Sequence, residues 1–243
     1  HGGKARQFYQ ERGEAAIDFS ANLNPWPPGV QCDLPGDVFS SYPDDRYQVL
    51  KETIAARFHR PPEEIAVGNG SIELIRVFCL AVLSIGDRVR IRKPTFVEYE
   101  RSARLAGACL SGEGEKAAVG FLCNPNNPTG TVQTRGSVLD QASGVEVLFV
   151  DEAFIELSDI SQSVSDARDP AVFICRSLTK CFSVPGIRFG YGFGDPDLIQ
   201  RMETIRPPWS VNSVAEQFAI RAFAAFDQLE QSRNRIRAER EWL

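Results

Sequence analysis

The sequence is poor in the residues that build metal sites. Only two of its 243 residues are histidines, and none of its six cysteines has C-x-x-C spacing. A zinc site is therefore not expected, because such sites are built mainly from clustered cysteines and histidines. No other metal site is expected either. The cysteines are expected to be reduced thiols, as in a cytoplasmic enzyme.

The sequence also lacks the features of a membrane or nucleic-acid partner. No apolar run approaches the ~20 residues that a membrane-spanning helix needs. No basic and apolar signal segment opens the chain. The net charge of −5 gives no electrostatic reason to expect nucleic acid or an anionic membrane as a partner.

Strand-like and helix-like segments alternate along the chain, which predicts a mostly parallel sheet covered by helices on both faces. A nicotinamide-binding version of this α/β fold is not expected, because G-x-G-x-x-G after the first strand is absent. The expected strands are 65–67, 88–91, 119–123, 145–150, 172–175 and 189–193, and the expected helices are 47–58, 71–83 (capped by Ser71), 96–105, 137–142, 196–205 and 211–226.

The composition changes near both ends of the sequence. Residues 1–45 contain prolines at 25, 27, 28, 35 and 43, which predict an irregular arm. Residues 46–228 carry the alternating pattern of one large domain. Residues 229–243 are charged and helical, and we expect them to begin a linker helix toward a small domain that is largely absent from this sequence.

One lysine stands in a setting that suits covalent chemistry. Lys180 ends the segment 177–180 (SLTK), and Arg188 follows eight residues later between glycines. Lysine amines bond the aldehyde of pyridoxal phosphate, and nearby cations help keep the nitrogen reactive. Alone, the motif more often marks a solvated surface lysine, so the interpretation depends on further motifs upstream.

Three such motifs follow expected strands. Residues 68–71 (GNGS) open a helix, where free backbone N–H groups can bind a phosphate. Residues 124–130 (NPNNPTG) follow the strand 119–123, at the edge where open α/β sheets bind ligands. Asp151 ends another buried strand, where a carboxylate needs a partner such as a protonated ring nitrogen.

Asn127, Asp151, Lys180 and Arg188 occur in that order, and together these motifs resemble the fold-type-I pyridoxal-phosphate enzymes of the aspartate aminotransferase superfamily. The resemblance implies a three-layer αβα large domain that binds pyridoxal 5'-phosphate. It makes Lys180 and Asp151 the catalytic residues, the first bonding the cofactor aldehyde and the second pairing with the ring nitrogen. The resemblance implies further cofactor contacts from Asn69, Gly70, Ser71, Phe96, Asn127, Ser177 and Arg188, and from Tyr42 across a homodimer interface.

Two groups within the superfamily compete. Residues 1–3, 18–25 and 208–212 resemble the threonine-phosphate decarboxylases, and Phe154 stands where aminotransferases usually carry a tyrosine. This implies decarboxylation of L-threonine O-3-phosphate to (R)-1-amino-2-propanol O-2-phosphate in cobalamin biosynthesis. The alternatives are a histidinol-phosphate aminotransferase and a non-catalytic cofactor-binding protein. His1, Asn22 and Asn24 are the candidate substrate contacts, and for each of them a purely structural part in the arm is an equal alternative.

Overall fold

The computed structural model describes residues 4–13, 18–112 and 114–242. Its centre is a seven-stranded sheet with the order β1-β7-β6-β5-β4-β2-β3. Strand β7 runs antiparallel to both neighbours, whereas the other pairs are parallel, which confirms the expected α/β fold. The strands are β1 (Ile65–Gly68), β2 (Arg88–Ile91), β3 (Cys109–Leu110), β4 (Ala117–Cys123), β5 (Val145–Asp151), β6 (Val172–Ser177) and β7 (Gly190–Phe193).

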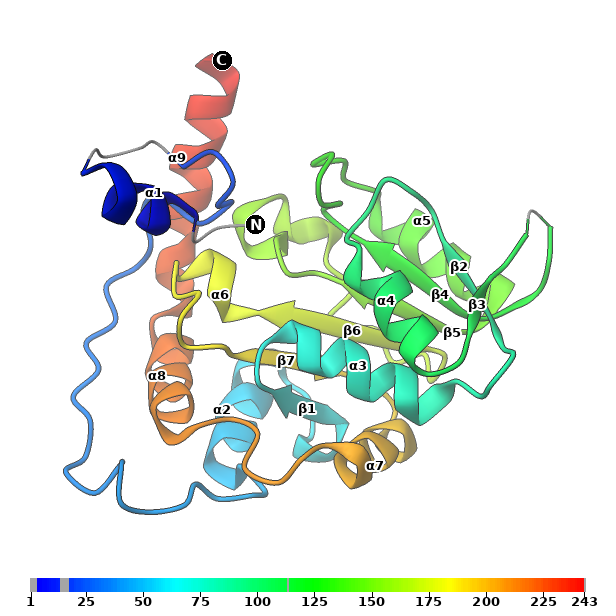
Figure 1. The fold of residues 1–243 in the computed structure, drawn as a ribbon, viewed down its shortest axis with the longest axis horizontal. Coiled ribbons are helices and arrows are strands. Elements are labelled where there is room, and N and C mark those ends of the chain that lie inside the picture. The colour runs from blue at the N-terminus through cyan, green and yellow to red at the C-terminus, as the bar shows by residue number, and fades with distance from the viewer. Residues whose placement is uncertain (1–3, 14–17, 113, 243) are drawn as a thin grey trace.

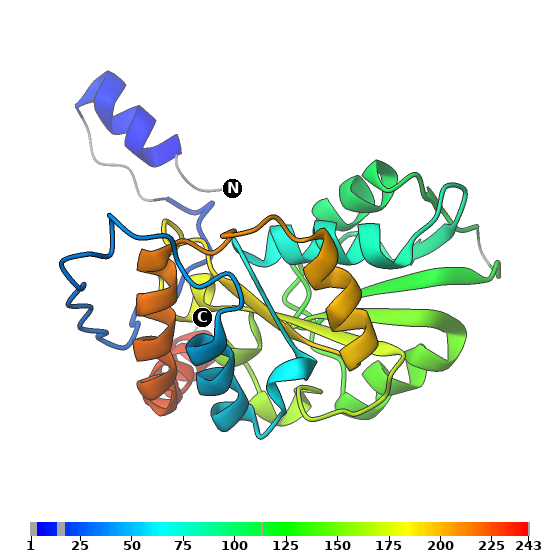
Figure 2. The same cartoon turned by 90° about the horizontal axis from the view of Figure 1, so that it is seen from below.

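Helices cover both faces of this sheet, as Figures 1 and 2 show. Successive side chains of a strand point to opposite faces, so β5 divides its residues between two hydrophobic clusters. Phe149 packs with one cluster, whereas Leu148 and Val150 pack with the other. The first cluster takes in α3 (Ser71–Val82), α4 (Glu98–Leu105) and α7 (Pro196–Ile205), and the second takes in α2 (Gln48–Phe58), α5 (Arg135–Asp140), α8 (Ser213–Ala224) and the start of α9 (Leu229–Trp242).

The strand register brings several chain segments to one edge of the sheet. Cys123 at the end of β4 pairs with Asp151 at the end of β5, and Asp151 pairs with Cys175 of β6. The carboxyl ends of these three parallel strands therefore lie side by side. Ligands bind at this edge in open α/β sheets.

Three local features differ from the sequence-based expectations. The arm contains helix α1 (Lys4–Arg12), since its prolines begin only at Pro25. The two-residue strand β3 was not expected, because two residues are too few to show the alternation of apolar and polar residues that marks a strand. Gly70, not Ser71, occupies the N-cap position of α3, without a side-chain capping bond. One-turn helices are η1 (Pro62–Glu64), η2 (Gln141–Gly144), η3 (Ile155–Leu157), η4 (Ile160–Gln162), η5 (Phe226–Gln228) and, in α form, α6 (Leu178–Cys181).

Within the described ranges, no helix combines the length and the apolar composition that crossing a membrane requires.

Candidate active site

A cavity of about 290 Å³ opens at the carboxyl ends of β4, β5 and β6. Its size is near the lower limit of small-ligand pockets, which is roughly 300 Å³. The first turn of α3 and the one-turn helix α6 complete its wall. Eight residues expected from the sequence line it: Asn22, Ser71, Phe96, Asn127, Asp151, Ser177, Lys180 and Arg188.

Lys180 supplies an amine to this cavity. The hydroxyl of Ser177 accepts a hydrogen bond from the backbone N–H of Thr179 over 3.2 Å and so caps the short helix that carries the lysine. The lysine Nζ donates to Asn22 Oδ1 over 2.8 Å and lies 5.5 Å from the centre of the Phe154 ring. Burial and the positive charge of Arg188 lower the pKa of Lys180, and the charge of Asp151 opposes them. The amine is therefore neutral more often than that of a solvated lysine.

Asp151 supplies a carboxylate opposite this amine and is only 3% exposed. Its Oδ1 accepts from the backbone N–H of Ala153 over 2.9 Å, and its Oδ2 accepts from the Tyr99 hydroxyl over 2.7 Å. Burial raises the pKa of Asp151, whereas these two hydrogen bonds and the charge of Lys180 act to lower it. A buried acid that faces a cavity is suited to a cationic ligand atom, such as a protonated ring nitrogen.

The third part of the cavity is a cradle for an anion. Arg188 has a left-handed backbone, with φ of 58°, and a Cβ at Gly70 would lie 2.6 Å from its Nη2. A Cβ at Gly190 would lie 2.5 Å from the backbone nitrogen of Ser71. The two glycines thus let the guanidinium and strand β7 approach the first turn of α3. A cation beside a helix N-terminus is a suitable site for a phosphate.

The asparagine-rich turn contributes one of its three asparagines to the cavity. Asn124 is 1% exposed and binds the backbone of Gln133 in both directions, through its Nδ2 and its Oδ1. The Asn126 amide binds the backbone of Pro94 and the hydroxyls of Thr95 and Thr129. Asn127 lines the cavity. The first two amides shape the turn, and the third faces the ligand space.

An amine, a buried acid and an anion cradle within one cavity fit pyridoxal phosphate. They match, in turn, its aldehyde, its ring nitrogen and its phosphate. Phe96 lines the same wall and offers an aromatic surface beside the ring site. The residues present are therefore chemically suited to this cofactor.

Two expected site residues differ from their expected positions. Asn69 is exposed and its backbone N–H donates to Glu73 Oε2 over 2.7 Å, so it does not line the cavity. Asn24 does not line it either: its side chain is 2% exposed and is occupied by bonds to Cys181, Ser232 and Trp26. Its own backbone N–H donates to the carbonyl of Lys180 over 3.0 Å. Asn24 therefore attaches the arm to the lysine turn and leaves Asn22 to face the cavity.

A further expected residue, Tyr42, does not line this cavity. Tyr42 is 81% exposed, and its ring lies 4.6 Å from that of Trp209. Its expected partner is a neighbouring subunit, so that role stays a prediction. His1 lies outside the described residues.

Tyr99, which was not predicted as a site residue, also lines the cavity and contacts Asp151. A signal for it exists, because Tyr99 follows Phe96 by three residues in the expected helix 96–105, where residues three apart would share a face, although α4 itself begins only at Glu98. Other lining residues that were not expected are Ile72, Glu98, Cys123, Ala153 and Thr179.

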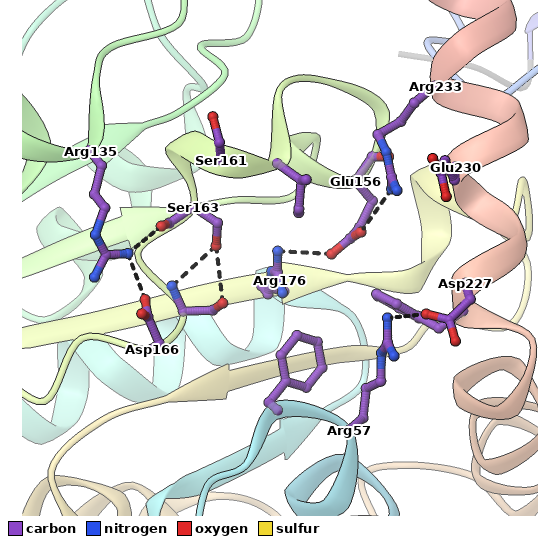
Figure 3. Close-up of a pocket in the computed structure, with 14 residues that line it drawn as sticks. Arg57, Arg135, Glu156, Ser161, Ser163, Asp166, Arg176, Asp227, Glu230 and Arg233 are labelled. Atoms are coloured by element: carbon purple, nitrogen blue, oxygen red, sulfur yellow. Dashed lines mark hydrogen bonds and ion pairs between the residues drawn. The ribbon is translucent and has the colours of Figure 1, made fainter.

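A larger cavity of about 690 Å³ lies elsewhere, beneath β6 and between α2 and α9 (Figure 3). The buried Arg176 at its centre is paired with Glu156 over 2.8 Å and with Glu152 over 3.3 Å. At its rim, Arg57 pairs with Asp227. Since its arginines are matched by carboxylates, this cavity offers no excess charge for an ionic ligand, and we regard it as a structural network.

Comparisons with known proteins agree with the chemistry of the smaller cavity. The family model described as "Aminotransferase class I and II" matches residues 34–111 and 108–243. Over 252 residues the chain is 35% identical to a protein of Caldanaerobacter subterraneus subsp. tengcongensis named "Putative threonine-phosphate decarboxylase" (90% of this chain, 67% of that protein). It is 30% identical over 225 residues to histidinol-phosphate aminotransferase 2 of Carboxydothermus hydrogenoformans (83% and 61%).

A solved structure has the same fold. The histidinol-phosphate aminotransferase of Sinorhizobium meliloti, in complex with pyridoxal-5'-phosphate, superposes with a TM-score of 0.85 at 21% identity (98% of this chain, 72% of that chain). The chain thus spans 61–67% of the length of the two curated relatives. These matches confirm the resemblance inferred from the sequence.

Proposed function

Because the chain belongs to the class I and II aminotransferase family, we propose that it is the large part of a pyridoxal-phosphate enzyme that decarboxylates L-threonine O-3-phosphate. The observation that carries this choice is the hydrogen bond of 2.8 Å from Lys180 Nζ to Asn22 Oδ1. It brings the segment 18–25, which resembles the decarboxylases, to the reactive amine. Phe154, beside the same amine, lacks the hydroxyl that aminotransferases usually place there. The 35% identity to the Caldanaerobacter protein is further support.

The residues that would hold the cofactor are those of the three cavity parts. Lys180 Nζ is the amine for its aldehyde carbon, and Asp151 is the acceptor for its ring N–H. Ser71, Ser177 and Arg188 would surround its phosphate. When bound, pyridoxal phosphate supplies an electron sink for the charge that develops at the substrate's Cα.

The remaining chemistry belongs to the side chains of this chain. Asp151 would keep a proton on the ring nitrogen, because a nearby opposite charge favours the protonated, charged form of that nitrogen. Lys180 would deliver a proton to Cα in the place of the departing carbon dioxide. The lowered pKa of Lys180 makes its ammonium group a stronger acid for this proton transfer. The product is (R)-1-amino-2-propanol O-2-phosphate, and the balance is one carbon dioxide lost and one proton gained.

A histidinol-phosphate aminotransferase is the second candidate, favoured by the 30% identity to the Carboxydothermus enzyme. In that reaction Lys180 would remove the Cα proton instead of supplying one. The same residues serve both reactions, so the orientation of the substrate's Cα bonds selects between them.

The two candidates are separated by assaying the full-length protein with both substrates. Release of carbon dioxide from L-threonine O-3-phosphate, with no 2-oxoglutarate from glutamate and imidazole-acetol phosphate, is the expected result. The reverse pattern would replace the proposal by the aminotransferase. A bound-cofactor absorption band near the visible without product from either substrate would instead favour a non-catalytic cofactor-binding protein.

The proposal includes a homodimer in which Tyr42 reaches the cofactor phosphate of the neighbouring subunit. Tyr42 supports it, because its exposed ring stands with Trp209 on the surface instead of within its own cavity. Sedimentation of the full-length protein tests the dimer.

A further inference from the structure

Tyr99 is the direct partner of the acid in the cofactor site. Its side chain is fully buried, with its ring stacked 5.3 Å from Phe121 and edge-on 5.6 Å from Phe96. Its hydroxyl donates to Asp151 Oδ2 over 2.7 Å. When the carboxyl is ionised, such a bond is charge-assisted and about twice as strong as a neutral one.

With the bond from Tyr99, both carboxylate oxygens of Asp151 accept a hydrogen bond from the protein. Oδ1 accepts from the Ala153 backbone and Oδ2 accepts from Tyr99, so rotation of the carboxylate would break one bond or both. A carboxylate offers about four lone-pair positions, so lone pairs stay available for a ligand in the cavity. The tyrosine itself is held by its aromatic neighbours. The tightly packed ring of Tyr99 therefore fixes the direction in which the Asp151 carboxylate faces the cavity.

We propose that Tyr99 is a positioning residue for Asp151, and that it keeps the shared proton on the ring nitrogen of the cofactor instead of on the carboxylate. A hydrogen bond to the charged form of an acid favours that form. Without the phenol, Asp151 becomes more basic and competes better for the proton of the ring. The inference rests on the part of the proposed function that places pyridoxal phosphate in this cavity. It holds for decarboxylation and transamination alike.

Two measurements on the full-length Tyr99→Phe variant test this inference. The ring stays and only the hydroxyl is lost, so packing is preserved. The dissociation constant for pyridoxal phosphate is expected to rise roughly ten-fold, because Asp151 is no longer held toward the ring nitrogen and its own hydrogen bond to the cofactor weakens. The pH midpoint of the bound cofactor's absorption is expected to move upward, because a ring without its proton withdraws fewer electrons from the bonded amine.

A matched control is Tyr191→Phe. Tyr191 is equally buried and packs on the other face of the sheet, and its hydroxyl has no hydrogen-bond partner within the described part of the chain. This variant should leave the dissociation constant and the spectral midpoint unchanged. Equal effects of the two substitutions would contradict the inference, because they would reflect a general response of the core.

A double-variant cycle identifies the route of the effect. If Tyr99 acts through Asp151, its substitution should have little further effect on cofactor binding in an Asp151→Asn background. A full ten-fold effect there overturns the inference, as does an unchanged Tyr99→Phe variant of a wild type that binds the cofactor normally. A wild type that binds no pyridoxal phosphate refutes the proposed function as well, so the two failures are distinguishable.

Discussion

The amine of Lys180 and the amide oxygen of Asn22 are joined by a 2.8 Å hydrogen bond across 158 positions of sequence. The bond links the arm to the lysine of the cavity, and Asn24 holds the adjoining part of the arm in place. Asn24 binds the backbone of Lys180 and Cys181, and its burial keeps the arm in place. The two asparagines thus have separate parts, one toward the cavity and one toward the fold.

This separation predicts opposite effects of two alanine substitutions. Asn22→Ala should lower kcat/KM with L-threonine O-3-phosphate roughly ten-fold, since one hydrogen bond at the reactive amine is lost. The free energy of unfolding should change by less than about 0.5 kcal/mol, because Asn22 is exposed. Asn24→Ala should lower the unfolding free energy by about 1–3 kcal/mol, because buried partners lose their bonds. Urea unfolding and steady-state kinetics of the two variants check these effects. A clear loss of unfolding free energy in Asn22→Ala would contradict the separate parts assigned to Asn22 and Asn24.

The lowered pKa of Lys180 predicts a pH effect on the unliganded protein. The cause is burial first and Arg188 second. Between the lowered pKa and the ordinary value near 10.5, the unfolded chain holds more protons at this site than the folded protein does. The free energy of unfolding should therefore rise with pH in that window more steeply in the wild type than in Lys180→Met. Urea titrations at several pH values measure the difference, and equal slopes would mean that the lysine is not perturbed.

The close approach of Gly70 and Arg188 predicts a loss of cofactor affinity in Gly70→Ala. The new Cβ would lie 2.6 Å from Arg188 Nη2, so the guanidinium must leave the cradle. The dissociation constant for pyridoxal phosphate should rise at least about ten-fold, by loss of a charged hydrogen bond. The positive φ of 78° adds a stability cost of roughly 1 kcal/mol or more.

Gly86→Ala is the matched control for this substitution. Gly86 also has a positive φ, of 94°, and its Cβ would meet nothing within 4 Å. It should show a similar loss in thermal denaturation and bind the cofactor as the wild type does. Weaker cofactor binding in Gly86→Ala would show that backbone strain, not displacement of Arg188, lowers the affinity.

The buried pair of Arg176 with Glu152 predicts a stability effect that depends on pH. Arg176→Met leaves Glu152 and Glu156 buried without their cation and should cost about 3–5 kcal/mol. Burial raises the pKa of Glu152, and the charge of Arg176 opposes it, so the substitution raises this pKa further. An acid with a raised folded pKa loses stability as the pH rises through that value. The loss should therefore be smaller at pH 5 than at pH 8.

Arg57→Met provides the comparison for Arg176. The pair of Arg57 with Asp227 is largely exposed, so its loss should cost no more than about 1 kcal/mol and depend little on pH. Chemical denaturation at both pH values measures the two variants. Similar losses of unfolding free energy at both pH values for Arg176→Met would mean that Glu152 and Glu156 are not left as buried, unpaired charges.

Much of the fold could be predicted because strand and helix periods are local. The limits of β2 and α7 agree with the expected ranges to the residue, since each segment has turn signals at both ends. Strand β3 and the cap of α3 could not be predicted in this way. Strand β3 has two residues, and at the cap Gly70 is required by the approach of Arg188 from a distant segment.

The sequence by itself determined which chemical groups are present and on which strand ends they stand. Asn127, Asp151 and Lys180 follow strands, and parallel strands bring their carboxyl ends to one edge. Only the tertiary structure decided which groups touch: Asn22 rather than Asn24 at the amine, and Tyr99 at Asp151, 52 positions away. The physical reason is that contacts between distant segments depend on how helices and loops pack, and a local pattern of residues carries no record of that packing.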